Sequence, residues 1–136
     1  YEMIQDYTKN ITSEEEILIK EFMPGLVTII LEKNNKVNNL ITSNTNYVAI
    51  RIPNNKDLLE IIKKLGKPVI STSANIEEKT ITNIYDLEED LKKQINYIYD
   101  GGIQKGESST IVKFNNHKLT ILREGILSNE LRKRFK

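Results

Sequence analysis

A cluster of small hydrogen-bonding side chains follows a short apolar run near the middle of the chain, where residues 67–75 read KPVISTSAN. The apolar run predicts a buried strand over 68–71, and ligands of open α/β sheets gather beyond the carboxyl ends of strands. Hydroxyl and amide groups there could donate hydrogen bonds to phosphate or carboxylate oxygens. An ordinary turn or helix cap is the alternative, since Ser, Thr and Asn also form those. The candidate side chains are Ser71, Thr72, Ser73 and Asn75.

Two arginines stand at the ends of predicted strands. Arg51 closes the apolar run YVAIRIP, and Arg123 precedes Glu124-Gly125. A buried arginine needs an anionic partner, either a structural carboxylate or a ligand held in a bidentate manner. For Arg51 the alternative is an edge strand with the side chain facing water, and for Arg123 it is a surface ion pair.

Hydroxyl groups also gather before a β-branched strand in Glu107-Ser108-Ser109-Thr110, which follows a glycine-containing loop. Glycines allow a loop to approach a ligand closely, although they suit an ordinary loop equally well. We interpret His117, the single histidine, as a surface residue beside a turn. The basic tail that begins at Arg132 suits the C-terminus of a helix dipole, with RNA contact as the less favoured interpretation. No metal-ligand spacing, P-loop or dinucleotide fingerprint is present in the sequence.

Composition limits the class of protein. A chain of 136 residues with 38% hydrophobic and 29% charged residues suits one folded domain of ordinary size. A net charge of +1 does not favour a strongly electrostatic nucleic-acid binder. The absence of cysteine excludes disulfides and thiolate metal sites and fits a cytoplasmic location. No apolar run approaches the ~18–20 residues of a membrane-spanning helix.

Helical and strand patterns alternate along the first two thirds of the chain. We expect a helix opened by a Ser13–Glu16 capping box, a strand over 26–31 covered on both faces, and a strand over 47–52. A helix then runs from an Asn54 or Asn55 cap to Gly66. Further elements are expected as follows: a helix marked by Ile84, Leu87 and Leu91, a strand over 97–99, a hairpin of 110–114 with 119–122, and a helix over 129–135. The pattern predicts an α/β domain with a twisted open mixed sheet and flanking helices.

Taken in order, the candidate motifs resemble the YrdC-like family, the threonylcarbamoyl-AMP synthases of transfer-RNA modification. The resemblance runs from about Pro24 to Gly125, so that residues 1–136 would form the C-terminal two thirds of a YrdC-like domain. The segments that carry it are PGLVT (24–28), VAIRIP (48–53), KPVISTSAN (67–75), DGG (100–102), STIV (109–112) and ILREG (121–125).

The resemblance implies a reaction and a set of residue roles. Threonine and bicarbonate would form a carbamate that attacks the α-phosphate of ATP, with Mg²⁺ expected on the phosphates, to give threonylcarbamoyl-AMP and pyrophosphate. A downstream transferase would then use the product to modify adenosine 37 of transfer RNA. The threonine-binding residues would be Arg51, Ser71 and Ser109. The ATP-binding residues would be Tyr47, Ser73, Asn75 and Arg123, and no catalytic side chain or protein metal ligand is assigned.

The sequence departs from the family pattern in three places. A Thr-x-x-Tyr/Phe-Gly-Leu segment and a Lys-x-Arg pair are expected before Tyr1, and this chain alone could be inactive without that pair. Glu77-Glu78 replaces the usual Ser-Gly, and two carboxylates near a triphosphate would repel it. Leu26 replaces the proline usual in P-G-P-x-T.

Two other functions remain open. The Glu77-Glu78 departure suggests a non-catalytic relative that binds double-stranded RNA or a nucleotide. The other alternative, which is less favoured, is the carbamoyl-transfer domain of hydrogenase maturation factors. Those proteins carry zinc-finger cysteines upstream of this domain.

Overall fold

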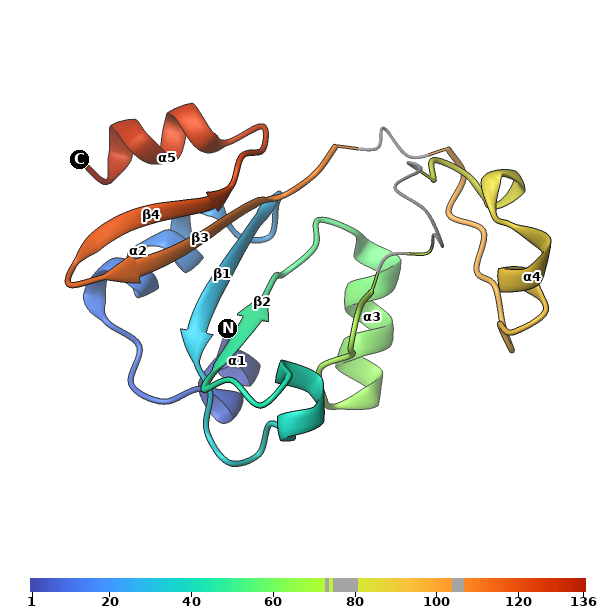
Figure 1. The fold of residues 1–136 in the computed structure, drawn as a ribbon, viewed down its shortest axis with the longest axis horizontal. Helices are drawn as coiled ribbons and strands as arrows, with labels where there is room; N and C mark the ends of the chain where they lie inside the picture. Colours follow the sequence, from blue (N-terminus) through green and yellow to red (C-terminus); the bar gives the residue numbers. More distant parts are fainter. Residues whose placement is uncertain (73, 75–80, 104–106) are drawn as a thin grey trace. The chain divides into compact units, whose positions relative to one another are not determined.

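The computed structural model describes residues 1–72, 74, 81–103 and 107–136. The chain falls into two compact units, of which the first combines Tyr1–Val69 with Ser108–Lys136 and the second is Ile70–Glu107. Figure 1 shows the chain in sequence colours. The assignment of residues 1–136 to one domain stays a prediction.

A mixed four-stranded sheet with the order β2-β1-β3-β4 organises the first unit (Figure 1). β1 pairs parallel with β3, and each of them pairs antiparallel with its outer neighbour. Consequently β1 and β3 begin at the same edge of the sheet where β2 and β4 end. The predicted α/β class with a mixed sheet and flanking helices is confirmed. The strands are β1 (Val27–Glu32), β2 (Tyr47–Ile50), β3 (Thr110–Asn115) and β4 (Lys118–Arg123).

Helix ends in this unit follow local capping chemistry. Helix α2 (Ser13–Phe22) begins with a capping box of Thr12 and Glu15, so the predicted Ser13–Glu16 box was wrong by one residue. Thr12 has the extended backbone of an N-cap, and its N–H donates to Glu15 Oε2 at 2.8 Å. The remaining helices of the unit are α1 (Glu2–Tyr7), the 3₁₀ turn η1 (Asn39–Thr42), α3 (Lys56–Leu65) and α5 (Ser128–Arg134).

Two predicted elements are confirmed closely. Asn55 Oδ1 accepts a hydrogen bond from the N–H of Leu58 at 3.0 Å at the start of α3, and Gly66 ends the helix at φ 69°. β3 and β4 form the predicted hairpin, and Asn116 and His117 in its turn both have positive φ.

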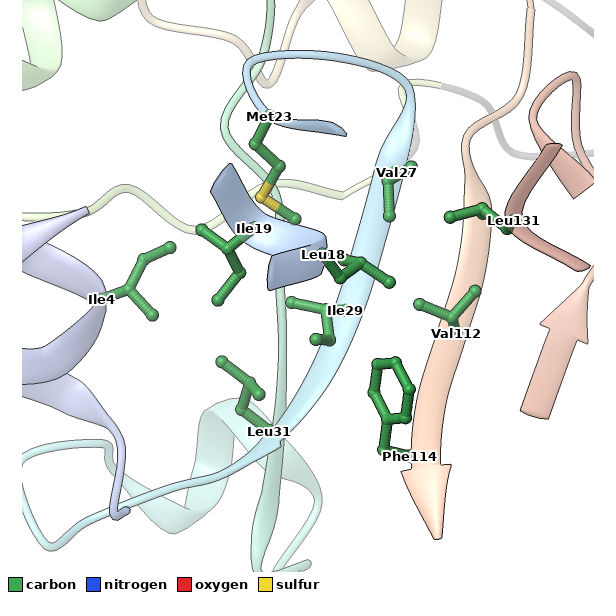
Figure 2. Packing of buried hydrophobic residues seen from close by; sticks show 10 residues of the cluster. All are labelled: Ile4, Leu18, Ile19, Met23, Val27, Ile29, Leu31, Val112, Phe114 and Leu131. Carbon is green, nitrogen blue, oxygen red and sulfur yellow. The ribbon is translucent and has the colours of Figure 1, made fainter. Parts of the chain in front are cut away.

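One face of the sheet packs on three helices. Val27, Ile29 and Leu31 of β1 are buried, whereas Thr28 and Ile30 between them are only half-buried. The buried side chains share one cluster with residues from α1, α2, β3 and α5 (Figure 2), namely Ile4, Leu18, Ile19, Met23, Val112, Phe114 and Leu131. β1, which was predicted to be covered on both faces, is therefore buried on one face and half-buried on the other. We call the second face, which carries the half-buried Thr28, Ile30, Ile111 and Lys113, the open face.

Two predicted strands are not formed in the described part of the chain. Residues 67–72 contain no strand, and the side chains of Val69 and Ile70 are 45% and 74% exposed. Residues 97–99 are likewise not a strand, and Tyr97 is exposed. Apolar β-branched runs satisfy local propensity only, because a strand also needs a neighbour with which to pair.

The second unit contains short helical turns where one longer helix was predicted. They are η2 (Ile84–Asp86) and α4 (Glu89–Lys92). The carboxylate of Asp86 accepts hydrogen bonds from Thr82 and Asn83, and these bonds hold its pKa below the ordinary value. In neither unit does a described helix have the length and apolar character needed to cross a membrane.

Replacing Leu18 with alanine should destabilise the first unit strongly. Leu18 is fully buried, and leaving a cavity at such a site costs about 2–5 kcal/mol. Its neighbour Ile17 is 37% exposed, so Ile17→Ala on the same helix serves as the control and should cost less than about 1 kcal/mol. Urea denaturation followed by circular dichroism measures both, and equal losses would contradict the packing described here.

Candidate anion-binding site

Polar side chains from all four strands meet at the edge where β1 and β3 begin. Arg51 follows the end of β2, and Arg123 is the last residue of β4. Ser109 directly precedes β3, and Thr28 is the second residue of β1. The topology therefore joins segments that lie far apart in the sequence.

Ser109 is the centre of a hydrogen-bond network. Nη2 of Arg123 donates to both the hydroxyl and the backbone carbonyl of Ser109 at 2.9 Å, and Nε of Arg123 donates to the same carbonyl at 3.2 Å. The hydroxyl of Thr28 lies 2.8 Å from that of Ser109. Ser109 is 5% exposed, so this network fixes its hydroxyl in place.

Arg51 is anchored by the backbone of the segment before β1. Its Nε donates to the carbonyl of Gly25 at 2.8 Å, and the N–H of Gly25 donates to the carbonyl of Ile52 at 2.9 Å. β2 is an edge strand and Arg51 is exposed. This agrees with the alternative of an edge strand with its arginine facing water, rather than a buried arginine. Partial burial is the larger cause that lowers the pKa of Arg51, and the positive charge of Arg123 lowers it further. Arg51 and Arg123 thus place two like charges at the same edge of the sheet.

Carboxylates do not neutralise this pair within the described residues. Neither Arg51 nor Arg123 takes part in any of the ion pairs formed there. By contrast, Arg132 pairs with Glu124 and Arg134 pairs with Glu21. These ion pairs engage two of the cations in the basic tail for which RNA contact was the less favoured interpretation. Two adjacent guanidinium groups that keep their charge can bind carboxylate or phosphate oxygens.

Tyr47 lies at the other end of β2 and contacts a lysine on the open face. Its ring centroid is 3.5 Å from the Nζ of Lys113, a cation–π contact. Neither Lys113 nor Thr28 was predicted from the sequence to be a site residue. Side chains alternate between the two faces along β1 and β3, and this alternation could have placed Thr28 and Lys113 on the face opposite the core. In the sequence, however, the continuous apolar run around Thr28 hides the alternation.

The remaining predicted site residues are not joined to this cluster by any described contact. Ser71 is exposed and belongs to the second unit. Ser73 and Asn75, as well as Glu77 and Glu78, lie outside the described residues. The structure therefore brings together Arg51, Ser109 and Arg123, and the roles of the others stay predictions.

A metal ion finds no ready ligand set in the described ranges. They contain no group of three His, Cys, Asp or Glu side chains that could hold one. His117 lies in the hairpin turn with its side chain exposed, and its Nδ1 is 2.9 Å from Glu14 Oε1. The described residues therefore do not fit a protein-held Mg²⁺ site.

Known proteins share this arrangement of strands. The family model for Sua5, YciO and YrdC proteins, described as "Telomere recombination", matches residues 1–125. This chain belongs to the Sua5/YciO/YrdC family. Relatives include the threonylcarbamoyl-AMP synthases of Pyrococcus abyssi, 33% identical, and of Bacillus subtilis, 31% identical. The crystal structure of P. abyssi Sua5 complexed with L-threonine superposes with a TM-score of 0.90 at 32% identity.

The Sua5/YciO/YrdC relatives are longer than this chain. The P. abyssi alignment covers 96% of this chain and 39% of the relative, and the B. subtilis alignment covers 93% and 38%. The superposed P. abyssi structure covers 99% of this chain, which corresponds to 40% of that structure.

Replacing Gly125 with alanine should disturb the site. A Cβ there would lie 2.6 Å from the backbone N of Thr110 and 2.8 Å from the carbonyl O of Ser108. Because backbone atoms cannot yield easily, we expect a loss of about 1–3 kcal/mol in the free energy of unfolding. The exposed neighbour Ile126, replaced by alanine, is the control. An unchanged urea midpoint for Gly125→Ala would show that the segments carrying Arg123 and Ser109 are not packed this closely.

Proposed function

We propose that this chain contributes to the synthesis of threonylcarbamoyl-AMP from L-threonine, bicarbonate and ATP. The observation that carries the proposal is that two guanidinium groups, Arg51 and Arg123, share one edge of the sheet and form no ion pair with any described carboxylate. The relatives named as threonylcarbamoyl-AMP synthases support the same conclusion. The substrates of that reaction are a threonine carboxylate, bicarbonate and a triphosphate, and the carbamate formed from the first two is also an anion, so an anion-binding edge suits them.

Threonine would bind at the Arg51 end of the site. With its Nε committed to the Gly25 carbonyl, Arg51 keeps its two terminal nitrogens for the ligand carboxylate. The hydroxyl of Ser109 would donate a further hydrogen bond, and Ser71 would complete the set as the family resemblance implies. That P. abyssi Sua5 has been crystallised with L-threonine supports this choice of ligand.

The nucleotide would extend from Arg123 along the open face of the sheet. Arg123 directs Nε and Nη2 at Ser109, so Nη1 remains for a phosphate oxygen. Ser73 and Asn75 would contact the phosphates, and Tyr47 would contact the nucleoside. Lys113 beside the Tyr47 ring would add positive charge to this end of the face.

The chemistry then requires positioning and charge stabilisation rather than a protein nucleophile. A carbamate oxygen attacks the α-phosphorus of ATP, a new P–O bond forms, and the bond to the β-phosphate oxygen breaks as pyrophosphate leaves. The guanidinium groups reduce repulsion between the anionic reactants and stabilise charge in the transition state. An Mg²⁺ ion bound to the ATP phosphates would neutralise part of their charge.

The chemistry of the product indicates which kind of enzyme would use it next. Threonylcarbamoyl-AMP is a mixed anhydride that a downstream threonylcarbamoyl transferase would consume to modify transfer RNA. The enzyme would act in the cytoplasm, where ATP and transfer RNA are available.

The full-length protein should release pyrophosphate only when ATP, L-threonine and bicarbonate are all present. Omitting either threonine or bicarbonate should lower the rate to background, since the carbamate that attacks ATP cannot form without both. A coupled pyrophosphate assay measures this dependence. ATP turnover at the same rate without threonine would contradict the proposed function.

Replacing Arg51 with lysine should weaken threonine binding more than it weakens ATP binding. Lysine keeps the charge but loses the planar fork, and a hydrogen bond to a charged group is worth about 1.5–3 kcal/mol. We expect KM for threonine to rise about tenfold to a hundredfold. Arg132→Lys is the matched control, because Arg132 already pairs with Glu124 at the surface. Equal changes in both variants would remove Arg51 from the threonine site.

A further inference from the structure

Among the described residues, the side chains that contact the Ser109 hydroxyl are those of Thr28 and Arg123. The two hydroxyl oxygens are 2.8 Å apart, and either one could donate. Thr28 is held rigidly for this contact, because it sits within β1 and pairs in register with Ile111 of β3. Its neighbours Val27 and Ile29 are fully buried on the opposite face, so β1 cannot shift to relax the contact.

The hydrogen-bonding capacity of Ser109 limits how this network can operate. A serine hydroxyl has two lone pairs and one proton, and a guanidinium group can only donate. Arg123 Nη2 therefore uses one lone pair of the Ser109 oxygen. If Thr28 donates to the other lone pair, then the proton of Ser109 has no remaining acceptor in this network and is free for a ligand. If Thr28 accepts instead, Ser109 can offer no proton to the site.

We infer that Thr28 is a positioning residue that donates to Ser109 and thereby directs the Ser109 proton at the ligand carboxylate. An anionic ligand selects this direction, because a carboxylate accepts hydrogen bonds and donates none. The chain of bonds then runs from Thr28 to Ser109 to the ligand, with Arg123 donating to Ser109 from the side. Each donor in such a chain polarises the next, which strengthens the final bond to the carboxylate.

The inference rests on the proposed function, since it takes Ser109 to contact threonine. It concerns binding of the amino acid only. Thr28 should therefore affect KM for threonine while leaving kcat and KM for ATP nearly unchanged, whereas a general structural defect would alter all three.

The test compares Thr28→Val, which removes the hydroxyl at almost constant shape, with Thr28→Ser, which retains it. In the full-length protein, Thr28→Val should raise KM for threonine about three- to tenfold, the value of one neutral hydrogen bond. Thr28→Ser should stay within about twofold of the wild type. Thr120→Val is the matched control, because Thr120 is half-buried on β4 and its hydroxyl contacts Asn115 rather than Ser109.

Ser109→Ala separates this inference from the proposed function. If Ser109→Ala raises KM for threonine but Thr28→Val does not, the positioning role is wrong and the proposed function stands. If Ser109→Ala has no effect, Ser109 does not bind threonine. The threonine-binding role of Ser109 and the positioning role of Thr28 then both fail. Should thermal melting show that Thr28→Val folds poorly, Thr28→Ala takes its place, and parallel increases in KM for ATP and threonine would overturn the inference.

Discussion

Two positively charged side chains at one edge of the sheet, Arg51 and Arg123, are the feature on which the candidate site depends. Burial and the charge of Arg123 both lower the pKa of Arg51. Each arginine is held by a backbone carbonyl, Gly25 for one and Ser109 for the other. A neutral carbonyl fixes the position of a guanidinium group but leaves its charge in place. A carboxylate in the same position would cancel that charge. An anionic ligand that binds the folded protein at these two charges should in turn stabilise the fold.

The mixed topology of the sheet is what brings these groups together. Because β1 and β3 are parallel and lie between two antiparallel outer strands, two strand beginnings and two strand ends share one edge. If β3 ran antiparallel to β1, Ser109 would lie at the opposite edge, about 20 Å away for a six-residue strand. The buried residues Val27 and Val112 hold β1 and β3 in this register. The core therefore determines the site as directly as the site residues do.

Local sequence signals predicted local structure well. The Asn55 cap, the Gly66 end of α3 and the hairpin turn each depend on a few neighbouring residues, and all three are observed. Arg51, Ser109 and Arg123 were noted as candidates from their positions beside predicted strands, and their assigned roles came from the family resemblance. Their proximity could not be derived from residue pattern, because it depends on strand order. The strand predicted at 68–71 failed for the same reason, since propensity alone supplies no partner strand.

The contribution of Ser109 differs in kind from that of the arginines. Two guanidinium groups supply charge, and charge alone attracts any anion that can reach them. If Thr28 donates to Ser109 as we infer, the Ser109 hydroxyl accepts from both Arg123 and Thr28 and offers a single proton in a single direction, which selects the position of an acceptor. The same arrangement would make Ser109 a poor nucleophile, because attack requires a free lone pair. Under the proposed function, such a site would hold the two reactants in the geometry for reaction with each other, as adenylyl transfer from ATP to a carbamate requires.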